Sequence, residues 1–359
     1  MFDFLNNWLS TGGFWVAIPL IIAGCAALIK GADFLVDGAS ALAKKYGVSD
    51  IVIGLTVVAF GTSMPEFVVN MVAVGQGSTE IAITNVLGSN IINIFVILGF
   101  TALIFPISSQ KSTRRFDIPF SLLAAVLVLL FAVYNSPSWL EVEHLFNIHI
   151  TDPSFRDWGS IQIGRGSGGF ISGVGGSILL IFFLIFLWHN FKGIGSAPQT
   201  ESTEDYKPMS VKRALALIIG GLIGLVVGGE VIVKSATSIA HSLGVSDAII
   251  GLTVVALGTS LPELATSCMA AFKKNCDIAL GNVVGSNLFN IFFILGTSAC
   301  VKELPGYHGL EWDALMAALG SVLVMLFVYL TKKHEIKRWH GAILLLAYAA
   351  YLAYRINTL

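Results

Sequence analysis

One segment of about fifty residues occurs twice in this chain. Residues 49–99 align without a gap with residues 246–296, at an offset of 197 positions, and 28 of the 51 aligned positions are identical. Two unrelated apolar helices that share only their composition would not keep this identity through polar residues. The repeat therefore indicates a duplication, so the two halves of the chain should fold into the same unit.

The composition is that of an integral membrane protein. Of the 359 residues, 55% are hydrophobic and 12% are charged, against about 25% charged in a typical soluble domain. A bilayer core about 30 Å thick needs about 20 apolar residues per helix, and the alternation typical of membrane barrels is absent. We therefore predict an all-α membrane protein with ten transmembrane helices, near residues 14–30, 50–75, 80–105, 117–134, 172–189, 211–229, 247–272, 277–300, 310–330 and 338–356.

Charge and cysteine content exclude several classes of function. The formal net charge is −1, so there is no basic field that would hold nucleic acid. The four cysteines form no Cys-x-x-Cys pair, so we expect neither a disulfide framework nor a zinc site. No HExxH, GxSxG or Ser–Lys pair lies in the spans, which argues against an intramembrane hydrolase. We expect no enzyme activity and no cofactor.

Lysine and arginine gather on one side of the ten predicted spans. The loops after odd-numbered spans hold 15 of the 21 Lys and Arg residues, and cytoplasmic loops carry such an excess. Both termini are then outside, and span 2 runs opposite to span 7, its counterpart in the repeat. This predicts two inverted five-helix repeats, 1–190 and 211–359, joined by a cytoplasmic linker at 191–210. Inverted repeats place a substrate site near the bilayer midplane between the halves.

Each repeat carries the motif Gly-Thr-Ser-x-Pro-Glu, at residues 61–66 and 258–263. Proline removes an N–H and clashes with the preceding turn, while glycine lowers helix stability, so the helix should open here. Free carbonyl, hydroxyl and carboxylate oxygens then meet at mid-membrane. An ionised carboxylate costs at least about 2.5 kcal/mol at that depth, and no Lys or Arg lies inside either hydrophobic stretch to pair with it. Glu66 and Glu263 therefore indicate a bound cation.

The third and eighth spans add a matching set of polar residues. Ser89 and Asn93 lie four residues apart, as do Ser286 and Asn290, so each pair can line one wall of a cavity. All the candidate ligands are oxygens, which suit hard ions such as Na⁺ and Ca²⁺. Four further amides fit either this role or hydrogen bonding between helices: Asn85, Asn90, Asn282 and Asn287.

The paired motifs GTSMPE and GTSLPE, with GSNIIN and GSNLFN, resemble the two α-repeats of the cation/calcium antiporters, and within that family the prokaryotic sodium/calcium exchangers. The resemblance implies the exchanger fold, a prokaryotic cytoplasmic (inner) membrane, and Ca²⁺ and Na⁺ as transported ions. It implies that Glu66 and Glu263 share calcium, with backbone oxygens of Thr62 and Thr259. It also implies sodium ligands at Ala59, Ser63, Ser89, Ala256, Thr259 and Ser286. Ser260, Asn93 and Asn290 complete the candidate set.

The mechanism expected from this resemblance is alternating access, in which spans 1 and 6 shift while Ca²⁺ and Na⁺ compete for shared ligands. A proton/calcium antiporter of the same fold stays open, because buried glutamates can carry protons, and so does a passive cation channel. Potassium-coupled family members carry Asp where this chain has Asn290, which argues against potassium cotransport. Asp33 and Glu230 occupy equivalent positions near the predicted ends of spans 1 and 6, and we expect a structural or entrance role for both.

Overall fold

The computed structural model describes residues 3–134, 169–192, 209–243, 256–307 and 309–358, and these residues are mostly helical. The elements of the first half are α1 (Asp3–Tyr46), α2 (Asp50–Ile53), the π-helix η1 (Gly54–Val58), α3 (Ala59–Thr62), α4 (Met64–Gly75), α5 (Thr79–Ile92), the π-helix η2 (Asn93–Leu98), α6 (Gly99–Ile104), β1 (Ile107–Ser108), α7 (Lys111–Arg115), α8 (Asp117–Tyr134), β2 (Gly169–Ile171) and α11 (Gly173–Lys192). Those of the second half are α12 (Val211–Ser242), α14 (Ala256–Thr259), α15 (Leu261–Phe272), α16 (Cys276–Leu288), the π-helix η5 (Phe289–Leu295), α17 (Gly296–Val301), β3 (Leu304–Pro305), α18 (Leu310–Leu330), β4 (Glu335–Ile336) and α19 (Arg338–Thr358).

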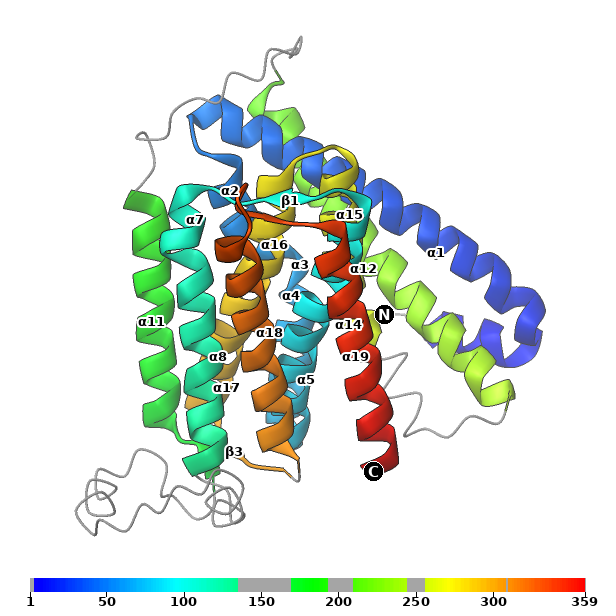
Figure 1. Ribbon diagram of the computed structural model, residues 1–359. Helices are drawn as coiled ribbons and strands as arrows, with labels where there is room; N and C mark the ends of the chain where they lie inside the picture. Colours follow the sequence, from blue (N-terminus) through cyan, green and yellow to red (C-terminus); the bar gives the residue numbers. More distant parts are fainter. Residues whose placement is uncertain (1–2, 135–168, 193–208, 244–255, 308, 359) are drawn as a thin grey trace.

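Most of the long helices stand upright in one bundle, while α1 and α12 run together at a slant along one side of it (Figure 1). Two short antiparallel ribbons join helix ends. In one ribbon β1 pairs with β4, and in the other β2 pairs with β3. Such short ribbons leave the predicted all-α class intact.

Seven described helices are long and apolar enough to cross a membrane. An eighth span consists of two pieces, 50–62 and 64–75, which are bent by 45° relative to each other. The remaining two predicted spans are not among these helices: residues 244–255 lie outside the described part of the chain, and α19, although 21 residues long, is less apolar. The structure therefore supports eight of the ten predicted spans. The predicted linker, 191–210, lies mostly outside the described residues.

The helices that contain the first and sixth predicted spans are longer than those spans. α1 continues to Tyr46 and α12 to Ser242. The residues that follow each hydrophobic stretch thus stay helical, although some of them are charged. Asp33 and Glu230 therefore lie inside these helices, beyond the predicted ends of the spans.

Glycines hold α1 and α12 in close contact. A Cβ atom added at Gly31 would lie 2.7 Å from the carbonyl oxygen of Gly221, and one added at Gly24 would lie 2.9 Å from that of Gly228. Real Cβ atoms do not approach a backbone so closely, so only glycine fits at these crossings. The offset of 197 relates Gly24 to Gly221 and Gly31 to Gly228, so the two crossings are equivalent under the repeat. These glycines were not among the residues predicted from the sequence.

Two helical segments form the centre of the bundle. The protein buries 78% of the most apolar stretch of 79–104 and 94% of that of 276–301, but only 22% of that of 14–46. The serine and asparagine residues of these segments therefore face protein, and α1 faces largely outward. The amides of Asn90 and Asn287 join the two segments, because each donates to the backbone carbonyl of the other, at 3.4 and 3.5 Å.

Candidate cation site between the repeats

The helix opens at both Gly-Thr-Ser-x-Pro-Glu motifs, as predicted. α3 ends at Thr62 and α4 begins at Met64, while α14 ends at Thr259 and α15 begins at Leu261. The serine between each pair has nearly the same backbone conformation, with φ −84° and ψ 5° at Ser63 and φ −91° and ψ 5° at Ser260. Proline then stands in the first turn of the next helix, where its missing N–H costs nothing. Each break places one glutamate in the first turn of the following helix.

The two glutamates are buried and close enough for their charges to repel. Each side chain is 1% exposed. Neither carboxylate oxygen of Glu66 has a hydrogen-bond partner among the described residues, and neither does Oε2 of Glu263. Burying unpaired carboxylate oxygens is costly without a compensating charge. The described residues contain no lysine or arginine paired with either glutamate, so the oxygens are available to a cation.

Hydroxyl groups from both repeats surround Glu263. The Ser63 hydroxyl donates to Oε1 of Glu263 at 2.9 Å, across the two repeats, and the Ser286 hydroxyl donates to the same oxygen at 3.5 Å. The Thr62 hydroxyl, which has one proton to donate, lies 3.1 Å from Oδ1 of Asn282 across the repeats and also within hydrogen-bond distance of two backbone carbonyls of its own helix. The predicted residues of the two halves therefore converge at this site.

Five further predicted residues, which lie in or beside the motif helices and the central segments, make no described side-chain hydrogen bond. The hydroxyls of Ser260 and Thr259 are buried and have no hydrogen-bond partner among the described residues. Ser89 and Ala59 are also buried. Ala256 begins α14.

The asparagines divide into two groups. Asn93 donates to Oδ1 of Asn287 at 3.0 Å, and Asn290 donates to Oδ1 of Asn90 at 3.0 Å. The amide oxygens of Asn93 and Asn290 have no partner among the described residues. Asn93 and Asn290 therefore keep an oxygen for an ion, whereas Asn90 and Asn287 hold the two repeats together. Asn93 and Asn290 lie in the π-helices η2 and η5, and such segments are frequent at functional sites.

A second layer of polar residues supports the two motif helices. Asn85 donates to Oδ1 of Asn70 at 2.6 Å and to the backbone oxygen of Glu66 at 3.4 Å. In the other half Asn282 donates to Ser267 at 2.9 Å and to the backbone oxygen of Glu263 at 3.2 Å. Asn70 and Ser267 were not predicted from the sequence. Both lie four residues after the motif glutamate and are equivalent in the repeat, a signal that could have identified them.

The number of acidic groups limits how the site can hold a cation. Among the described residues, no group of three or more His, Cys, Asp or Glu side chains could hold a metal ion. A cation here would therefore bind to two carboxylates together with neutral hydroxyl, amide and carbonyl oxygens. Such a ligand set suits Na⁺ and Ca²⁺ better than softer metals.

The sequence matches the family described as sodium/calcium exchanger protein over residues 16–192 and 213–357. The chain belongs to this family. It is similar to the sodium/calcium exchanger MaX1 of Methanosarcina acetivorans, with 34% identity over 351 residues that cover 93% of this chain and 96% of the relative. It is also similar to the inner membrane protein YrbG of Escherichia coli, with 32% identity over 293 residues and 81% of each chain covered.

The fold agrees with a solved structure of this family. The sodium-calcium exchanger NCX_Mj, in a crystal soaked with Na⁺ and Sr²⁺, matches with a TM-score of 0.73 and 32% identity, covering 94% of this chain and 97% of its own. Together with the family match, this confirms the predicted exchanger fold and a multi-pass protein of the membrane.

Proposed function

We propose that this protein exchanges Ca²⁺ for Na⁺ across the membrane by alternating access, with both ions bound between the inverted repeats. Its family is a family of cation antiporters rather than of enzymes. The finer assignment to sodium coupling follows from the resemblance of the site motifs and from the number of neutral oxygens around the two glutamates. Competition of Ca²⁺ and Na⁺ for Glu66 and Glu263 would couple the two fluxes.

One observation carries this proposal. Each repeat supplies one fully buried glutamate, and three of the four carboxylate oxygens have no partner among the described residues. The fourth accepts a hydrogen bond from Ser63 of the opposite repeat. Two negative charges balance one Ca²⁺, whereas Na⁺ ions would use the same charges together with hydroxyl oxygens. Two buried carboxylates without a counter-charge are costly, so the empty site is unfavourable and the site with either ion bound is favoured. A site of this kind therefore favours exchange of one ion for the other.

Uptake of calcium-45 into proteoliposomes tests the proposal. We expect uptake when the vesicles are loaded with Na⁺ and diluted into sodium-free buffer, and little uptake when Na⁺ is equal on both sides. The same vesicles with an imposed proton gradient and no Na⁺ should take up little calcium. Uptake driven by protons alone would support the proton/calcium antiporter instead. Calcium flux down its own gradient without any counter-ion would identify a channel.

We also propose a prokaryotic inner membrane, with both termini outside the cytoplasm. The excess of Lys and Arg on one side of the spans supports this orientation, and the relative YrbG is described as an inner membrane protein. Reporters fused to the C-terminus test it: a periplasmic phosphatase should be active and a cytoplasmic fluorescent protein should not. The opposite result would reverse the orientation.

A further inference from the structure

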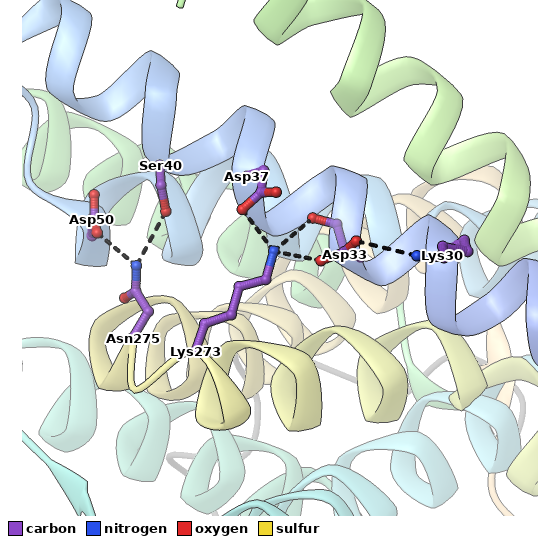
Figure 2. Close-up of polar contacts among 7 residues, drawn as sticks. All are labelled: Lys30, Asp33, Asp37, Ser40, Asp50, Lys273 and Asn275. Atoms are coloured by element: carbon purple, nitrogen blue, oxygen red, sulfur yellow. Dashed lines mark hydrogen bonds and ion pairs between the residues drawn. The ribbon is translucent and has the colours of Figure 1, made fainter. Parts of the chain in front are cut away.

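A charged cluster joins α1 to the end of α15, outside the cation site (Figure 2). The ammonium of Lys273 lies 2.6 Å from a carboxylate oxygen of Asp33 and 2.6 Å from one of Asp37. It also donates to the backbone carbonyl of Asp33 at 3.1 Å. Lys30 lies 4.0 Å from the other oxygen of Asp33. Lys273 therefore holds two successive turns of α1 against the helix that carries Glu263.

The neighbouring residue Asn275 makes a second connection to the same helix. Its amide nitrogen donates to the Ser40 hydroxyl at 3.2 Å and to Asp50 at 2.7 Å (Figure 2). Its amide oxygen accepts from the backbone N–H of Ile278 and so begins α16. The turn between α15 and α16 thus contacts α1 over the range 33–40, while also fixing the start of the central helix α16.

These contacts act on the pair α1 and α12 together. The glycine crossings bring the backbones of the two helices into direct contact, so we expect α1 and α12 to move as one body. The glutamate helix α15 runs from Glu263, in its first turn, to Lys273, which follows its end, ten residues and about 15 Å further along. α1 lies against this helix, so the cluster connects the α1–α12 pair to the helix that carries Glu263, at the end of that helix remote from the glutamate.

The equivalent positions of the other repeat do not reproduce this cluster. Lys273 corresponds to the uncharged Gln76, and Asp33 and Asp37 correspond to Glu230 and Lys234. Lys234 lies 3.4 Å from Glu230, so these two charges pair within α12 itself. Because Gln76 carries no charge, the bridge made by Lys273 has no counterpart at the equivalent position of the other repeat.

We propose that Lys273 is a positioning residue for transport, which together with Asp33 and Asp37 closes the seam between α1 and α15 and favours the conformation described here. This inference rests on the proposed alternating access. Inverted repeats exchange their conformations between the two end states, so a symmetric protein would populate both states alike. A bridge that only one state can make shifts that balance toward the state with the Lys273 side closed.

The calcium concentration for half-maximal exchange tests the inference. It is measured separately from each membrane side, in proteoliposomes of known orientation. The apparent affinity measured from one side is proportional to the fraction of protein that is open to that side. In Lys273→Gln the half-saturating calcium concentration should fall about threefold on the Lys273 side, and rise on the other side, as expected for loss of a partly exposed bridge. Lys273→Arg should restore the wild-type ratio. Lys274→Gln removes the adjacent charge, which has no ion pair among the described residues, and is the matched control.

A distance measurement tests the same inference without transport. Spin labels are attached at Lys45 of α1 and Lys332 after α18, both exposed, in a cysteine-free background. They report the distance between the α1–α12 pair and the rest of the bundle. Lys273→Gln and Asp37→Asn should each increase the population of a second distance, and Lys274→Gln should not. Unchanged distances, equal shifts of affinity on both sides, or no rescue by arginine would overturn the inference. Loss of sodium-driven transport with these distance changes intact would contradict the proposed function alone.

Discussion

Replacing Glu66 by Gln should abolish calcium exchange while the protein stays folded in the membrane. The change keeps the size of the side chain and one oxygen, and removes one of only two negative charges at the site. Both oxygens of Glu66 are buried and have no partner among the described residues. The Ser260 hydroxyl lies near the Glu66 carboxylate without completing a hydrogen bond, and glutamine keeps an oxygen there, so a loss of transport would report on the ion.

The magnitude follows from the charge. At about 4 Å and an effective dielectric constant of about 20, two unit charges attract by about 4 kcal/mol. A divalent ion therefore loses about 8 kcal/mol of attraction, and Na⁺ loses about half as much. The relief of the repulsion between the glutamates and the lower cost of burial offset part of this. Even one third of the calcium term lowers affinity by about 100-fold.

Calcium-45 uptake under a sodium gradient and calorimetric titration with Ca²⁺ measure the two effects. Glu263→Gln should behave in the same way, since glutamine keeps the oxygen that accepts from Ser63. Glu80→Gln is the control, because Glu80 is an exposed glutamate in the first turn of α5. Uptake near that of the wild type in well-expressed Glu66→Gln protein would refute the reasoning.

Three further predictions concern sodium, potassium and helix packing. Alanine at the hydroxyl positions removes an oxygen but no charge, so the sodium concentration for half-maximal exchange should rise more than that for calcium; four unchanged values would favour the proton-coupled alternative. The positions are Ser63, Ser89, Thr259 and Ser286. Exchange should proceed fully with choline in place of potassium, because a third charge is lacking, and Asn290→Asp should introduce a potassium response; potassium-dependent activity of the wild type at clamped voltage would contradict this. Gly31→Leu should lower the thermal unfolding temperature in detergent by several degrees through steric overlap with α12, whereas Gly220→Leu, with no described atom within 4 Å of its added Cβ, should not.

The repeat made much of the site predictable from sequence. Identity through polar residues marks positions where a side chain is needed for its chemistry, so both motif glutamates and the Ser–Asn pairs could be placed at one site. The opening of the helix followed from the proline and glycine of each motif, because a missing backbone N–H and a flexible glycine both act locally. The roles of Asn90 and Asn287 stayed open, since the hydrogen bonds that distinguish a ligand from a connection between helices exist only in the assembled protein.

Two features depended on tertiary contacts and could not be predicted. The length of α1 was underestimated because a hydropathy window stops at Lys30, whereas the charged residues beyond it are stabilised by the second half of the chain. Gly24 and Gly31 carry no signal of their own, because glycine in an apolar helix has several common causes. Their purpose becomes visible only when their partners on α12 are known.

The two glycine crossings between α1 and α12 also bear on how such a chain could arise. Repeat symmetry turns the crossing of Gly24 with Gly228 into that of Gly31 with Gly221. One surface patch thus meets its own copy, which is the geometry of an isologous dimer interface. A free five-helix chain with this patch could pair with a second molecule inserted upside down, using the same two contacts. Gene fusion then required a connecting segment but no new packing at this interface.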